Sequence, residues 1–130
     1  MPNQLFHSYQ LTEIERQRMD LDGHLAYPGL LTQEAQGDLT EALVHIHSLD
    51  KVEGHEPNRF AAEYNPYLES LINHPQMLEL VHQVLGDNIR YDHCVTLNRP
   101  GGNGGIYWHS HSYSEGDPRL GFIRIFFYVN

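Results

Sequence analysis

Residues 32–49 read TQEAQGDLTEALVHIHSL, and this stretch predicts a long helix. Its apolar residues recur at a spacing of three or four, which places most of them on one helix face: Ala35, Leu39, Ala42, Leu43, Ile46 and Leu49. Thr32 directly precedes the pattern, and a threonine hydroxyl at that position can accept a hydrogen bond from a free backbone N–H of the first turn. We therefore expect an amphipathic helix that contributes one apolar face to the core.

Three further segments carry helix signals. Thr12 and Glu15 have the spacing of a capping box, in which each side chain accepts a hydrogen bond from the other residue's backbone N–H. Residues 67–72 resemble one or two helical turns. Pro75 suits the first turn of another helix, because no N–H is left unpaired there, and Gly86 suits the end of that helix.

The last third of the chain changes character. Residues 89–97 and 106–113 have a strand-like composition, and residues 121–130, GFIRIFFYVN, are the most strongly strand-like stretch of all. A glycine-rich loop separates the first two of these segments. We therefore expect a single α+β domain that is mainly helical over residues 1–88 and β over residues 89–130.

Composition excludes several classes of protein. A length of 130 residues, with 40% hydrophobic and 19% charged residues, fits one globular domain. No stretch approaches the roughly 20 apolar residues of a membrane span, and the N-terminus lacks the pattern of a secretory signal. The single cysteine, Cys94, suits a reducing cytoplasm, and the net charge of −9 argues against nucleic-acid binding.

The ten histidines outnumber the eight lysines and arginines, but only one pair of them combines the spacing of a metal site with a strand-like segment. His45 and His47 lie two apart on a predicted helix and therefore point in different directions. His74 precedes a proline and suits a helix cap. His109 and His111 lie two apart in a strand-like segment, where alternate side chains share a face and can bind one metal ion. The alternative for this pair is two solvated rings on a sheet.

A carboxylate follows the histidine pair at a suitable distance. Glu115 lies four residues after His111 and can add an oxygen ligand to the two imidazole nitrogens. Two nitrogens and one oxygen with open coordination positions hold redox-active iron, manganese or copper. Asn98 lies beside the strand that leads to the glycine loop, and we expect it to contact a cofactor.

A series of motifs, in order along the chain, resembles the phytanoyl-CoA dioxygenase-like family of iron(II)- and 2-oxoglutarate-dependent oxygenases. They are Asp22-Gly23, residues 28–32 (PGLLT), 74–81 (HPQMLELV), 85–90 (LGDNIR), 98–101 (NRPG), 107–111 (YWHSH) and 115–119 (EGDPR). The resemblance implies a double-stranded β-helix, of which this chain contains the helical front and the first strands. It also implies iron(II) and 2-oxoglutarate as cofactors and hydroxylation of a small organic substrate.

The resemblance assigns the metal ligands residue by residue. His109 matches the family's first iron ligand, and His111 stands where the family has an aspartate. The family's distant histidine, and the basic residue near it that anchors 2-oxoglutarate, have no match in this chain. No catalytic side chain beyond the ligands is assigned, and we expect no nucleic-acid or membrane partner, with the oligomeric state open.

Two alternatives remain at the level of sequence. Residues 104–121, with His109, His111 and Glu115, approximate the first cupin motif but miss it by one residue at each glycine. This alternative is a metal-binding enzyme with all three residues as ligands. The other alternative is a truncated relative without catalytic activity that binds a partner or a small molecule.

Two further expectations concern a loop and a strand. Residues 50–66 have no periodicity and predict a long surface loop, which we expect to select the substrate. The apolar strand 122–129 predicts a C-terminally incomplete domain, because an open strand of this kind is a template for aggregation. We therefore expect the chain to aggregate or to require a partner.

Overall fold

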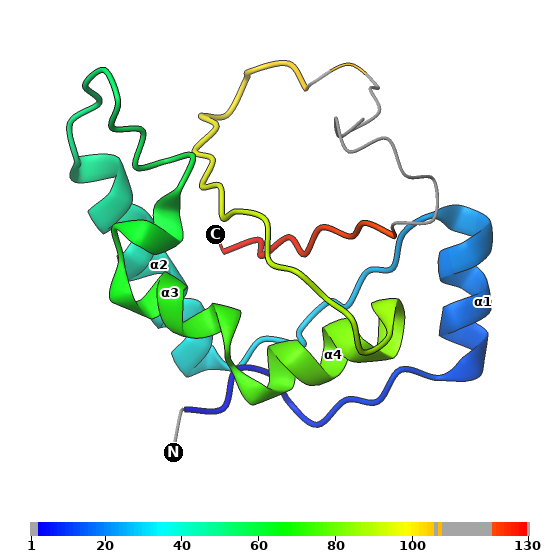
Figure 1. Ribbon diagram of the computed structural model, residues 1–130. Coiled ribbons are helices and arrows are strands. Elements are labelled where there is room, and N and C mark those ends of the chain that lie inside the picture. The colour runs from blue at the N-terminus through cyan, green and yellow to red at the C-terminus, as the bar shows by residue number, and fades with distance from the viewer. Residues whose placement is uncertain (1–2, 106, 108–120, 130) are drawn as a thin grey trace.

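The computed structural model describes residues 3–105, 107 and 121–129 (Figure 1). Four α-helices and one short 3-10 helix occur in these residues. They are α1 (Glu13–Asp22), α2 (Gln33–Ser48), η1 (Ala61–Glu63), α3 (Pro66–Ile72) and α4 (Pro75–Leu85). The helical front predicted from the sequence is therefore confirmed. None of the described helices is both long enough and apolar enough to cross a membrane.

The β part that we expected after residue 88 is not found in the described residues. The described residues contain no β-strand, only the isolated bridges between Phe6 and Leu31 and between Val52 and His55. Residues 89–97 and 121–129 follow open, extended paths without joining a sheet (Figure 1). The prediction of a double-stranded β-helix is therefore wrong for the described part of the chain, and residues 108–113 of the expected second strand lie outside it.

The physical reason for the error is that strand-like composition does not supply a strand partner. β-branched and aromatic residues favour a pleated, half-buried backbone, but a strand exists only where another segment completes its hydrogen bonds. Two main-chain hydrogen bonds join residues 89–97 to the segment that leads into η1. The Cys94 carbonyl accepts from the Ala61 N–H at 2.9 Å, and the Thr96 N–H donates to the Asn58 carbonyl at 2.8 Å.

Helix ends follow the local chemistry of the sequence. The Thr12 hydroxyl accepts from the Glu15 N–H, and the Glu15 carboxylate accepts from the Thr12 N–H at 2.8 Å, which confirms the capping box. The Thr32 hydroxyl accepts from the Ala35 N–H at 3.1 Å and starts α2. The His74 ring caps α4 by accepting from the backbone N–H two residues later at 3.2 Å. These caps fix where each helix begins.

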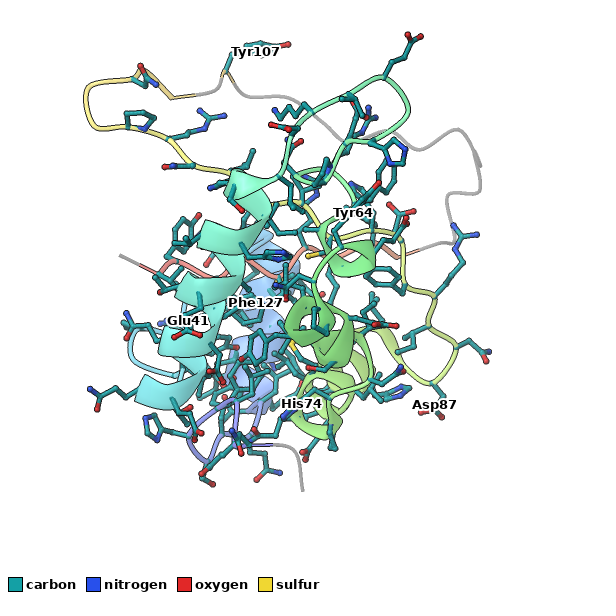
Figure 2. The ribbon with its side chains drawn as sticks, turned by 90° about the vertical axis from the view of Figure 1, so that its left-hand side faces the viewer. Glu41, Tyr64, His74, Asp87, Tyr107 and Phe127 are labelled. Atoms are coloured by element: carbon teal, nitrogen blue, oxygen red, sulfur yellow. The ribbon has the colours of Figure 1, made fainter. Side chains whose placement is uncertain are left out.

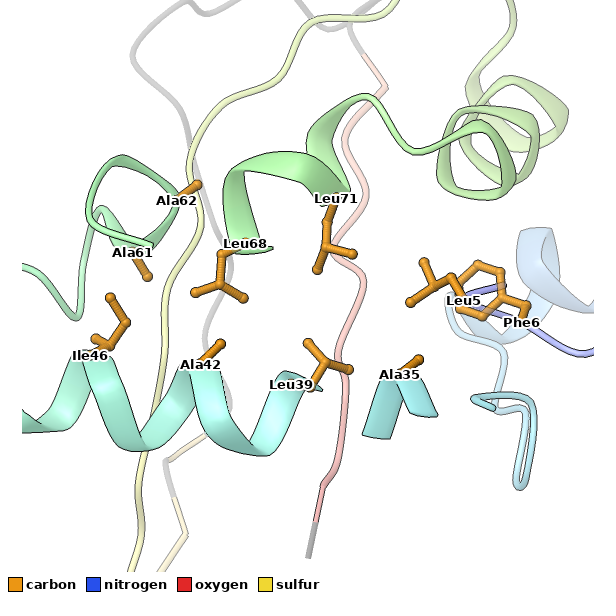
Figure 3. Packing of buried hydrophobic residues seen from close by; sticks show 10 residues of the cluster. All are labelled: Leu5, Phe6, Ala35, Leu39, Ala42, Ile46, Ala61, Ala62, Leu68 and Leu71. Carbon is orange, nitrogen blue, oxygen red and sulfur yellow. The ribbon is translucent and has the colours of Figure 1, made fainter. Parts of the chain in front are cut away.

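The core lies between α2, α3, η1 and the N-terminal segment (Figure 3). The inner face of α2 points toward Leu68 and Leu71 of α3, with η1 over one end and Leu5 and Phe6 at the other (Figure 3). The buried residues of this cluster are Leu5, Phe6, Ala35, Leu39, Ala42, Ile46, Ala61, Ala62, Leu68 and Leu71. The apolar face predicted for residues 32–49 therefore forms one side of the core.

The N-terminal segment is fixed to this core by a glutamine of α4. The Gln76 side-chain oxygen accepts from the N–H groups of Leu5 and Phe6 at 2.8 and 2.9 Å. Its amide nitrogen donates to the Phe6 carbonyl at 2.9 Å. Gln76 therefore replaces a neighbouring strand for two residues that are more than sixty positions away in the sequence.

Two buried threonines predict opposite effects of the same substitution. Thr96 is 6% exposed and its hydroxyl has no hydrogen-bond partner among the residues that the structure describes, whereas the Thr32 hydroxyl accepts from the Ala35 N–H and donates to the Gln4 carbonyl. We expect Thr96→Val to raise the free energy of unfolding by about 1 kcal/mol, because a buried unpaired hydroxyl is removed. Thr32→Val is expected to lower it by about 1–2 kcal/mol, because a cap is lost.

Urea denaturation of both variants measures these changes. Equal destabilisation by the two substitutions would contradict the assignment of the Thr96 hydroxyl as unpaired. The two sites are a matched pair, since both threonines are buried and valine keeps their shape.

Candidate functional site

The residues singled out in the sequence are only partly described. His109, His111 and Glu115 lie outside the described residues, so their roles as metal ligands stay predictions. Asn98 is described, and it lies exposed in the extended stretch after α4. The glycine loop at residues 101–105 is exposed as well. Among the residues that the structure describes, no group of three His, Cys, Asp or Glu side chains is placed to hold a metal ion.

A groove of about 510 Å³ occupies the region predicted as a long surface loop. Its lining comes from the first half of that loop and from η1 with the residues on either side of it: Val52, Glu53, Gly54, Glu56, Phe60, Glu63 and Tyr64. The sequence predicted a substrate-selecting loop at residues 50–66, but it did not predict that this loop lines a groove. The segment holds three glutamates and two aromatic residues without a regular spacing, so no sequence pattern signalled the groove.

Backbone and side-chain contacts hold one wall of this groove. The extended segment 91–98 runs beside η1, because Ala61 and Asn58 make the two main-chain hydrogen bonds described above. The Phe60 ring lies 6.4 Å from the His93 ring, and the Tyr64 hydroxyl lies 3.3 Å from Nδ1 of His55. Segment 91–98 lies beside this side of the groove, and Asn98 and the glycine loop follow it in the sequence.

The placement of the groove in the molecule is visible in a side view. Figure 2 shows Tyr64 toward the end of the molecule at which Tyr107 lies, with His74 and Asp87 at the opposite end. Tyr107 is 83% exposed, so it is not part of the groove wall. Tyr64 of the groove and Tyr107 are therefore found in the same half of the described structure.

Charge decides which ligands suit this groove. Three glutamates line it, and among the described residues one of them, Glu56, forms an ion pair with Arg59 at 3.4 Å, with both side chains largely exposed. Such an exposed ion pair contributes little. The groove is therefore unsuited to a dianion such as 2-oxoglutarate, whereas the Phe60 and Tyr64 rings beside carboxylates suit a neutral or cationic organic group.

The cysteine next to the groove is not set up as a nucleophile. Cys94 packs against the core, and its burial raises the pKa of the thiol. A raised pKa keeps the thiol protonated at neutral pH, and the thiolate is the reactive form.

We therefore expect Cys94 to react with a thiol reagent slowly in the folded chain. The rate at pH 7.5 should be on the order of tenfold below that of the same chain unfolded in urea, and it should rise with pH as the thiolate forms. Absorbance of released thionitrobenzoate measures both rates. Equal rates in the folded and unfolded chain would contradict this placement of the thiol.

Comparison of the chain with models of protein families, with curated proteins and with solved structures finds no match. The fold class of the described residues is helical, with α2 and α3 at the centre of the core. Arguments about function rest on the site residues themselves, since one fold hosts many functions.

Proposed function

We propose that the protein is a non-haem iron(II)- and 2-oxoglutarate-dependent oxygenase that hydroxylates a small organic substrate, with His109 and His111 as iron ligands. The observation that supports this proposal is the donor set His109-Ser110-His111 with Glu115 after it. The ordered motifs of the phytanoyl-CoA dioxygenase-like family add to it. The proposal concerns the metal-binding residues and does not depend on a double-stranded β-helix.

The chemistry of the donor set fits the proposed metal. Imidazole nitrogens suit iron(II), and a carboxylate completes the arrangement of two histidines and one acid found in non-haem iron oxygenases. His111 stands where the family has an aspartate, and Glu115 is the carboxylate ligand of the cupin-type alternative. The chemistry that iron(II) supplies when bound is activation of molecular oxygen, which couples decarboxylation of 2-oxoglutarate to hydroxylation of a C–H bond.

The described residues contribute the surroundings of this site. The exposed amide of Asn98 can donate to a carboxylate, which suits contact with 2-oxoglutarate. We assign the groove lined by Phe60, Glu63 and Tyr64 to the substrate, since its carboxylates disfavour the dianionic cofactor. A neutral or cationic aliphatic substrate follows from that lining.

The proposal also includes a cytoplasmic location for the protein. A single cysteine, with a thiol kept protonated by burial, suits a reducing environment. We place the protein in the cytoplasm, where a reducing environment keeps iron as iron(II).

Release of succinate tests the proposed reaction. The chain is incubated with iron(II), ascorbate, 2-oxoglutarate and a panel of neutral and cationic aliphatic compounds, and succinate is measured by mass spectrometry. We expect succinate above the metal-free background, and its loss in the variant His109→Ala, His111→Ala.

The matched control is His45→Ala, His47→Ala, which removes two exposed histidines of the same sequence spacing from α2, together with the hydrogen bond between His45 Nδ1 and the Asn65 side-chain amide, and is expected to keep activity. Succinate release that is the same in both double variants, or that needs no iron, would contradict the proposal.

A further inference from the structure

The glycine loop at residues 101–105 has the sequence GGNGG, and all five of its residues are exposed. It contains a turn, in which the Asn103 N–H donates to the Pro100 carbonyl at 3.4 Å and Gly102 has a φ of 84°. Asn103 ends this turn, and the next backbone nitrogen is that of Gly104. Asparagine is a chemically labile residue, and the residue after it decides whether its side chain reacts with the backbone.

The reaction that Asn103 and Gly104 permit is deamidation through a cyclic imide. The Gly104 backbone nitrogen loses its proton and attacks the side-chain carbonyl carbon of Asn103, so a C–N bond forms and the bond to the side-chain NH₂ group breaks. The NH₂ group takes up a proton and leaves as ammonia. Water then opens the imide at either carbonyl, which gives aspartate or isoaspartate. The net change consumes one water and releases one ammonia, with no oxidation or reduction.

The surroundings of the loop leave this attack open. Among the described residues, neither the Gly104 N–H nor the Asn103 side-chain amide takes part in a hydrogen bond. A Cβ atom added to Gly104 would meet no described atom within 4 Å, so the loop is not packed against other described residues at this point. Because glycine has no side chain, Gly104 neither shields its nitrogen nor restricts the backbone rotation that ring closure requires.

The other described asparagines lack this combination. The N–H that follows Asn58 donates to the Glu56 carbonyl at 2.9 Å, and the N–H that follows Asn73 donates to the Leu71 carbonyl at 3.2 Å. Asn65 precedes a proline, which has no N–H. The remaining described asparagines precede residues whose larger side chains shield the nitrogen, and these are Asn3, Asn88 and Asn98. The reacting nitrogen is therefore both free and unshielded at Asn103.

We propose that Asn103 is a deamidation site, at which the folded chain acquires aspartate or isoaspartate through a cyclic imide. The product places a carboxylate in the loop between Asn98 and His109 and adds one negative charge to the net charge of −9. Isoaspartate also lengthens the main chain of the loop by one methylene group. This modification is independent of the proposed oxygenase activity.

Ageing of the full chain in water enriched in heavy oxygen tests the proposal. The folded chain is incubated at pH 8 and 37 °C, and its peptides are mapped by mass spectrometry at intervals. We expect heavy oxygen to enter residue 103 at least about tenfold faster than any other asparagine, since glycine leaves its nitrogen accessible. A methyltransferase specific for isoaspartate should label the aged chain at the same position. Faster conversion of another asparagine, no conversion at residue 103, or conversion without isoaspartate would overturn the proposal.

Two glycine variants separate the reacting nitrogen from the loop as a whole. Gly104→Val is expected to slow conversion of Asn103 at least about tenfold, because a branched side chain shields the nitrogen and restricts the backbone. The matched control is Gly105→Val, which leaves the reacting nitrogen on glycine and is expected to change the rate by less than about twofold. Both positions are exposed and have room for a Cβ atom, so both variants are expected to fold. Equal rates in the two variants would overturn the proposal.

Discussion

Replacing Ile46 by alanine is expected to lower the free energy of unfolding by about 3 kcal/mol, within the range for large-to-small substitutions in a core. Ile46 is 1% exposed and projects from α2 toward Ala61 of η1 (Figure 3). Small neighbours leave the site little ability to close the resulting cavity, because an alanine has no flexible side chain that can move into it. The loss should appear in urea denaturation as a lower midpoint with an unchanged slope.

Val44 provides the control for this substitution. It lies on the same helix but is 67% exposed, so Val44→Ala is expected to change stability by less than about 0.5 kcal/mol. An equal effect of the two substitutions would mean that the inner face of α2 does not form the core.

Gln76→Leu is expected to cost about 3 kcal/mol, because it removes three hydrogen bonds and leaves partly buried backbone groups unpaired. The groups concerned are the N–H of Leu5 and both the N–H and carbonyl of Phe6. The loss should be accompanied by faster amide hydrogen exchange at these two residues, which is a local readout.

Gln83→Leu is the matched control on α4. The Gln83 oxygen accepts a single hydrogen bond, from the Leu11 N–H at 3.1 Å. The same change there is expected to cost about 1 kcal/mol and to leave exchange at Leu5 and Phe6 unaltered. Similar costs for the two glutamines would contradict the role of Gln76 in fixing the N-terminal segment.

The parts of the fold that the sequence predicted correctly depend on nearby residues. The Thr12–Glu15 capping box, the Thr32 cap and the apolar face of α2 each arise within a few positions of the chain, so their chemistry is visible in the sequence. The cap formed by His74 is of the same kind.

The parts that were missed depend on distant residues. The pairing of Gln76 with Phe6 spans 70 positions, and no local pattern signals it. Segments 89–97 and 121–129 have strand-like composition, but their pairing partners are not specified by that composition, so the predicted sheet is absent from the described residues. The groove beside Phe60 likewise forms only when η1 and the loop before it fold together. The histidine pair at 109 and 111 lies outside the described residues, and its role rests on the sequence pattern.

Titration of the chain with cobalt(II) in place of iron(II), followed by calorimetry, tests the proposed metal site most directly. We predict one metal ion bound per chain, and an affinity that falls on the order of 100-fold or more when His109 and His111 are replaced by alanine, since even loss of groups around a ligand costs 10–100-fold. Glu115→Gln separates the two metal-binding hypotheses, because it is predicted to do little in the oxygenase site and to weaken binding in the cupin-type site, and His45→Ala, His47→Ala is predicted to leave binding unchanged. Absence of stoichiometric binding, or equal affinity in the wild-type chain and the His109, His111 variant, would contradict the account.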